Sequence, residues 1–263
     1  LDTHLYLYYD PLHAEMTDYV GDTGETAAQQ VWANGYAGVW MKPSGGLLLD
    51  STRNQNHGTI YGATLTTGPL GACYSYDGVD DEVQCGNIPT NSADVTLEIL
   101  WAPGVDYSVN LPNGWYGGIG TYGVYAYGDS AGAYLAWASW EGRWVIGAPV
   151  ADNTNNRKSI GKNTPMAEGI PYHIVGVKES QNLSLYRDGA YNGAATLYSP
   201  ATIITATDFR IASGGGGHLH GMVQAVLYSK TARSPAWIAA TNLSLRDELI
   251  VYSDPGAPLT LAA

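Results

Sequence analysis

The two cysteines of the chain, Cys73 and Cys85, bound the stretch CYSYDGVDDEVQC and have eleven residues between them. A redox motif has two residues between its cysteines, and a zinc site takes four ligands, which no neighbouring Cys or His completes here. A hairpin folded about Val79 would set the two cysteines opposite each other, within reach of a disulfide. We therefore predict a Cys73–Cys85 disulfide, which would indicate an oxidising compartment; the alternative is a pair of buried thiols.

Aromatic residues gather between positions 115 and 144 and could do a different kind of chemistry, the binding of sugars. Sugar rings pack on exposed aromatic faces, and their hydroxyls pair with carboxylates and amides. The alternative is that these rings fill a core, because the chain has a single Phe and Tyr and Trp must replace it. We predict a glycan site formed by Trp115, Tyr125, Tyr127 and Trp140, with Asp129 as a polar partner.

The sequence shows only weak matches to the residue patterns of catalytic sites. Glycoside hydrolases use two carboxylates that face one cleft, whereas Glu98 in VTLEILW shares its strand face with Thr96 and Leu100. No Gly-x-Ser-x-Gly elbow is present. His218 and His220 would supply only two metal ligands. We therefore predict that the chain is not an enzyme.

Composition narrows the range of partners. The formal charge is −12, with 12 basic residues against 24 acidic ones, so nucleic acid is an unsuitable partner. No run of 18 apolar residues exists, so we expect no membrane insertion by a helix. The chain begins Leu-Asp-Thr without Met, as expected of a fragment or a processed product.

The elements that must position these residues are mainly strands. Segments with strand character recur between Gly, Asn, Asp and Pro residues, which is typical of an antiparallel sandwich. In 95–101 the alternation predicts one buried face and one mostly exposed face. A short helix is expected at 234–245, with Ser234 as N-cap and Pro235 in the first turn, and a weaker one at 25–32. The expected strands are 4–9, 58–66, 72–77, 82–86, 95–101, 115–127, 133–140, 143–148, 172–178, 183–187, 208–212 and 219–229.

Five segments in order resemble the laminin G-like domains of the concanavalin A-like lectin/glucanase superfamily. They are DSTRNQNHGTIYGAT, CYSYDGVDDEV, VTLEILWAP, YHIVGVKESQNLSLYRDGAYNG and FRIASGGGGHLHGMVQAVLYSKTARSPAWIAA. The resemblance covers about residues 37–250 and implies an all-β jelly-roll sandwich of two antiparallel sheets with one short C-terminal helix. Residues 1–36 resemble the end of a small β domain that precedes such modules in surface proteins. Residues 251–263 would form a tail.

The resemblance also bears on metal binding. Many relatives hold a structural calcium through acidic and carbonyl oxygens, and Asp50, Asp77, Asp80 and Asp81 are the matching candidates. The family often has an acidic pair in its penultimate strand, where this chain has Gln224 and Ala225. Because calcium takes six to eight oxygens, the loss of a donor weakens this expectation. The alternative is that DGVDD is simply a turn.

Three functions compete for this chain. We expect a non-catalytic module of an extracellular, cell-surface or virion-surface protein that binds a glycan or cell-surface polysaccharide. The alternative is a structural decoration, fibre or stalk domain whose partners are neighbouring subunits of a larger assembly. A glycoside hydrolase is the third and least supported possibility.

Overall fold

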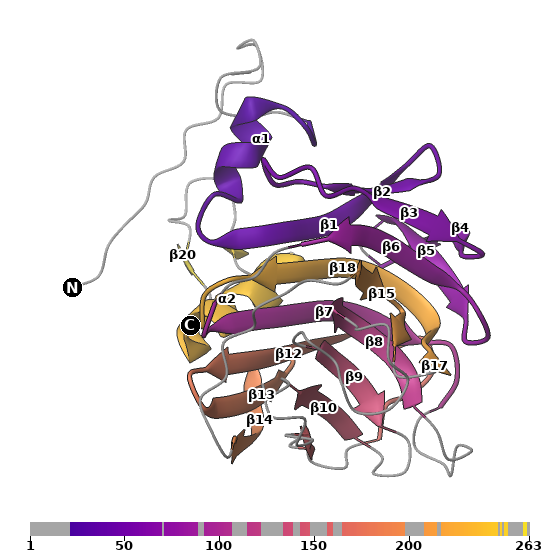
Figure 1. Ribbon diagram of the computed structural model, residues 1–263. Helices are drawn as coiled ribbons and strands as arrows, with labels where there is room; N and C mark the ends of the chain where they lie inside the picture. Colours follow the sequence, from indigo (N-terminus) through magenta and orange to yellow (C-terminus); the bar gives the residue numbers. More distant parts are fainter. Residues whose placement is uncertain are drawn as a thin grey trace.

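A computed structural model describes residues 22–69, 71–88, 92–106, 115–121, 134–138, 143–147, 157–159, 165–197, 208–214, 217–246, 248, 250–251 and 260–261. Antiparallel strands make up most of this part of the chain (Figure 1). The helices are α1 (Thr26–Val31) and α2 (Pro235–Leu245). Neither helix is long and apolar enough to cross a membrane.

Most strands form one hydrogen-bonded sheet, in which β4 and β5 branch off at β18, and this sheet folds into two facing layers. The first layer comprises β4 (Thr64–Gly68), β5 (Gly71–Asp77), β1 (Tyr36–Ser44), β18 (His220–Ser229), β7 (Val95–Pro103), β12 (Tyr172–Glu179), β13 (Asn182–Arg187) and β14 (Ala190–Thr196). The second comprises β2 (Leu47–Asp50), β3 (Gly58–Tyr61), β6 (Glu82–Asn87), β15 (Asp208–Ile211), β8 (Trp115–Thr121), β9 (Tyr134–Ala138), β10 (Arg143–Gly147) and β11 (Arg157–Ser159). Four short strands pair locally: β16 (Ser213–Gly214), β17 (Gly217–His218), β19 (Ile250–Val251) and β20 (Thr260–Leu261).

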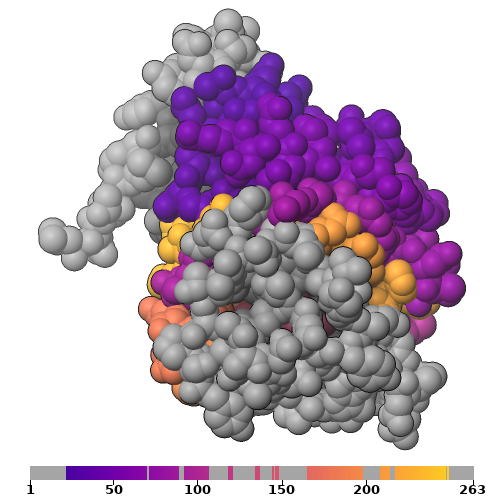
Figure 2. All heavy atoms as spheres, viewed as in Figure 1, coloured from indigo at the N-terminus to yellow at the C-terminus, as the bar shows by residue number. Residues whose placement is uncertain are grey.

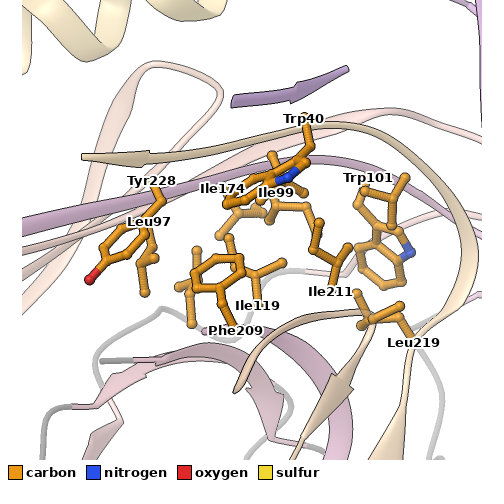
Figure 3. Close-up of a cluster of buried hydrophobic side chains, with 14 of the residues drawn as sticks. Trp40, Leu97, Ile99, Trp101, Ile119, Ile174, Phe209, Ile211, Leu219 and Tyr228 are labelled. Atoms are coloured by element: carbon orange, nitrogen blue, oxygen red, sulfur yellow. The ribbon is translucent and has the colours of Figure 1, made fainter. Parts of the chain in front are cut away.

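Aromatic rings join the two layers in the core. Phe209 of β15 lies between Trp40 of β1 and Tyr228 of β18, with ring centroids 4.9 and 5.1 Å away and nearly parallel planes (Figure 3). Trp101 of β7 meets Trp144 of β10 edge to face at 5.6 Å. The single Phe is therefore surrounded by Trp and Tyr, as the composition requires, and the all-β sandwich expected from the sequence is confirmed.

Strand β7 corrects one expectation. All nine of its residues are buried, so the face that carries Thr96, Glu98 and Leu100 is not exposed. This face meets a second apolar cluster that includes Tyr36, Leu227 and, at its margin, Leu245 of α2. The alternation in the sequence is real, but each face of the strand packs against a different part of the chain.

Helix α2 begins as predicted. The Ser234 side chain accepts a hydrogen bond from the Trp237 N–H at 3.2 Å, and Pro235 follows in the first turn. Helix α1 lies within the weaker predicted segment. The strands that the sequence did not predict are β1, β2, β11, β14, β16, β17, β19 and β20. The predicted strand 4–9 lies outside the described residues.

The predicted hairpin and disulfide are wrong. Strand β5 pairs with β4 and β18, whereas β6 pairs with β3 and β15, so the two strands belong to different layers. Cys73 and Cys85 are both buried free thiols. Cys73 packs beside Gly68 and Cys85 beside Gly58. Burial raises the pKa of both thiols, which keeps them protonated and unreactive.

Candidate functional site

Three neighbouring strands of the second layer, β3, β6 and β15, present polar side chains on their outer face. Val83 and Ile211 are paired across β6 and β15 and point into the core. The next pair, Gln84 and Arg210, therefore lies on the opposite face. Strand pairing sets β15 beside β6 and β6 beside β3, and Figure 1 labels all three. In Figure 2 orange atoms of the C-terminal third of the chain lie against purple atoms of the N-terminal third.

Glu82, Gln84, Asp208 and Arg210 form what we call the polar network. Arg210 Nη1 donates to both carboxylate oxygens of Glu82, at 3.0 and 3.3 Å. Its Nε lies 3.3 Å from an oxygen of Asp208. Gln84 Nε2 donates to Glu82 Oε1 at 2.5 Å. These contacts hold each side chain in one orientation before any ligand arrives.

The electrostatics of Glu82 favour its ionised form. Burial alone would raise the pKa of this carboxyl. Hydrogen bonds from Gln84 and Ser213 and the charge of Arg210 outweigh burial, so the pKa lies below its usual value. The side chain of Glu82 is 12% exposed and that of Arg210 is 35% exposed. A ligand can therefore reach donors of Arg210, while Glu82 stays an anchored acceptor.

Tyr61 adds an aromatic ring beside the polar network. It is directly opposite Glu82 in the β3–β6 ladder, and it remains 48% exposed. Opposite residues on neighbouring strands have Cβ atoms about 5 Å apart. Tyr61 and the polar network together place an apolar ring next to hydrogen-bonding groups, which is the combination that sugar rings require.

An acidic turn adjoins this surface. Carboxylate oxygens of Asp77, Asp80 and Asp81 lie within 4.8 Å of one another. Asp81 Oδ2 accepts from the Asp77 N–H at 2.8 Å, and Asp77 Oδ1 accepts from the Val79 N–H at 2.8 Å. The turn therefore satisfies its own backbone. Because calcium takes six to eight oxygens, three carboxylates would need carbonyl and water oxygens as well, and calcium binding stays a prediction.

Asp50 is not part of that turn, which corrects its assignment to the same metal site. Its two carboxylate oxygens accept hydrogen bonds from the N–H groups of Val39, Thr52 and Asn56, each at 2.9 Å. The Thr52 hydroxyl donates a fourth, also at 2.9 Å. The residue is fully buried. Asp50 holds the loop after β2 against β1.

The glycan site predicted from the sequence lies almost wholly outside the described residues. Tyr125, Tyr127, Asp129 and Trp140 lie outside the described residues, and so does the side chain of Trp115, whose backbone begins β8. Their role stays a prediction.

Glu98 is fully buried, as is the ring of His173, whose Nε2 lies 3.1 Å from Glu98 Oε2. Among the described residues, Glu98 Oε1 and His173 Nδ1 find no hydrogen-bond partner. A carboxylate in this position cannot reach a sugar. The pair belongs to the packing between β7, β12 and the elements that cover them.

A groove of about 480 Å³ opens on the other side of β3, at the edge of the sandwich. Its lining includes Gly45, Gly62, Leu65 and Tyr74. Only Ser44 and Tyr74 contribute polar side chains to it. The groove therefore offers few partners for sugar hydroxyls, and the polar network is the better candidate.

The sequence reading missed the polar network. The stretches EVQC and DFRI each alternate polar and apolar residues, which is a usable signal for two half-buried strands. What the alternation does not give is the pairing of β6 with β15. Glu82 and Arg210 are 128 positions apart in the chain.

No curated protein sequence matches the chain significantly. A laminin G-like family model, described as concanavalin A-like lectin/glucanases superfamily, matches residues 77–239, which is more than half of the chain. The chain belongs to this superfamily. The matched region includes the acidic turn and the polar network; the upstream domain expected before residue 37 and the proposed boundaries stay predictions.

Solved structures share the fold at low identity. Domain 4 of AbnA, an extracellular arabinanase of Geobacillus stearothermophilus in complex with arabinotriose, matches at 12% identity with a TM-score of 0.61, over 78% of this chain and 96% of that one. The binding domain of Paraclostridial Mosquitocidal Protein 1 matches at 11% identity with a TM-score of 0.59, over 82% of this chain and 54% of that one. Trypanosoma rangeli sialidase matches at 17% identity with a TM-score of 0.54, over 80% of this chain and 33% of that one.

This chain thus spans nearly the whole arabinanase domain, about half of the toxin binding domain and about one third of the sialidase. At these identities the likeness concerns the fold.

Proposed function

We propose that this chain is a non-catalytic module that binds glycans on the outer face of β3, β6 and β15. The observation that carries the proposal is the exposed ring of Tyr61 beside the hydrogen-bonded polar network. A sugar would stack on the ring and exchange hydrogen bonds with Arg210 and Gln84. The structure of an arabinanase domain with bound arabinotriose supports a glycan as the ligand class.

A non-catalytic role is supported by the placement of the carboxylates. Glu98 is sealed from solvent by packing. Glu82 is engaged by Arg210 and Gln84 and has a pKa below its usual value. A general acid in glycoside hydrolysis needs the opposite, a carboxyl with a raised pKa.

The setting we propose is extracellular, on a cell or virion surface, where many copies would act together. A shallow face with few hydrogen bonds should bind one glycan weakly, with about 4–8 kcal/mol, or micromolar to millimolar affinity. Display of many copies would raise the effective affinity by avidity. A purely structural module, held by neighbouring subunits, is the alternative that the test must separate.

The test is a glycan array probed with a multivalent form of the protein. We expect binding to a defined group of glycans and a loss of about tenfold, or ~1.4 kcal/mol, for Tyr61→Ala. Tyr191→Ala is the matched control, because Tyr191 is 60% exposed on β14 and lies against Tyr186. Absence of binding to every glycan, together with self-association of the protein, would favour the structural alternative.

A further inference from the structure

The polar network carries a net negative charge. Two carboxylates, Glu82 and Asp208, face one guanidinium, Arg210, which leaves one net negative charge within the network. Arg210 contacts both carboxylates, so its positive charge is already neutralised where a ligand would approach. A carboxylate on a sugar would therefore meet no uncompensated cation in the network.

The acidic turn adds negative charge near the polar network. Asp80 stands two residues before Glu82, where the turn passes into β6. Asp77 and Asp80 are exposed on the same turn. Two exposed carboxylates thus lie next to the end of β6 that carries Glu82, whereas Asp81 is buried. The whole chain points the same way, with a formal charge of −12.

We infer that this site takes neutral glycans and rejects acidic ones, such as uronic acid polymers and sialylated chains. The inference rests on the proposed glycan function. The hydroxyls of a neutral sugar can donate to Glu82 and Asp208 and accept from Arg210 and Gln84 without any cost of like-charge contact. The carboxylate of a uronic or sialic acid lies within a few ångströms of the same hydroxyls, so it would be brought next to the carboxylates of the network or of the turn.

The experiment compares matched pairs of oligosaccharides: galactose and galacturonic acid tetramers, glucose and glucuronic acid tetramers, and lactosamine with and without a terminal sialic acid. Binding is measured at one fixed pH and with EDTA, so that no divalent cation neutralises the turn. We expect the neutral member of a bound pair to bind at least about fivefold more tightly at low ionic strength. The difference should shrink as salt is added, because salt screens the repulsion.

A charge variant separates repulsion from shape. The double variant Asp77→Asn and Asp80→Asn removes two charges from exposed positions outside the polar network. It should strengthen binding of the acidic member by about two- to fivefold and leave the neutral member unchanged. The control is Glu179→Gln, because Glu179 is an exposed acid at the end of β12 far from the turn: β12 ends beside the start of β7, whereas the turn lies at the other end of β7.

The outcomes are distinct. Equal or tighter binding of the acidic member, or a double variant that changes both members alike, would overturn the selectivity and leave the glycan function intact. Failure of all six oligosaccharides and of the array would remove the glycan function itself, and the selectivity with it.

Discussion

At the scale of single residues, buried polar side chains belong to the packing of the molecule. Glu98 and His173 face each other 3.1 Å apart with no exposure to solvent. A buried charged or polar pair is costly to break, because the remaining partner keeps its desolvation penalty without compensation. The residue that looked most like a catalytic acid in the sequence is therefore a determinant of stability.

Glu98→Ala should lower the free energy of unfolding by about 3–5 kcal/mol. The measurement is urea denaturation at neutral pH. Glu168→Ala is the control, since Glu168 is exposed and its change should cost less than about 0.5 kcal/mol. A loss for Glu98→Ala no larger than that of the control would show that the pair contributes nothing.

Glu82 should make folding stability depend on pH. Its pKa is lowered in the folded state, so its ionised form contributes stability above the pKa of an unfolded Glu. That contribution is lost as the pH falls from about 4.3 through the lower folded value. The gap in unfolding free energy between the wild type and Glu82→Gln should therefore close over this acid range. A gap that stays constant from pH 7 down through that range would contradict the assignment.

At the scale of elements, residues next to each other in the chain define the start of α2, whereas the arrangement of the strands depends on which strands pair. Ser234 and Pro235 define the start of α2 with no reference to the remainder of the chain. The hairpin expected around Val79 was also inferred from neighbouring residues alone. It is wrong because β5 pairs with β18 in one layer and β6 pairs with β3 in the other. Alternation along 95–101 was read correctly as a strand, but the sequence carries no sign of what covers its second face.

Ser234→Ala should destabilise the protein by about 1 kcal/mol, because the Trp237 N–H loses its acceptor. Thermal denaturation would report the change. Ser244→Ala, at an exposed position of the same helix, should be neutral or slightly stabilising, since Ala has the higher helix propensity. Equal effects for the two variants would mean that the cap contributes nothing.

The placement of β5 and β6 makes a prediction about the thiols. Alkylation of the folded protein should be slow at both Cys73 and Cys85, because both are buried. Alkylation after unfolding without reductant should label both. Recovery of a disulfide-linked peptide by mass spectrometry would contradict the strand arrangement and restore the hairpin.

At the scale of the whole molecule, the sandwich brings distant segments into one surface. The polar network joins residues that are 128 positions apart in the chain. On the inner face of β15, Phe209 stacks on Trp40 and Tyr228 and so packs this strand against the other layer. The superfamily and the sandwich could be predicted from ordered motifs. The site could not, because it depends on which strands lie side by side.

Chemical-shift mapping by NMR is the most direct test of the central claim. The isotope-labelled protein would be titrated with the best ligand from the glycan array. The account predicts that the largest amide shifts fall at Tyr61, Glu82, Gln84 and Arg210, with small shifts at Tyr191 and on α2. Shifts gathered instead around Trp115, Tyr125, Tyr127 and Trp140, or on the edge groove near Leu65, would contradict the placement of the site on β3, β6 and β15.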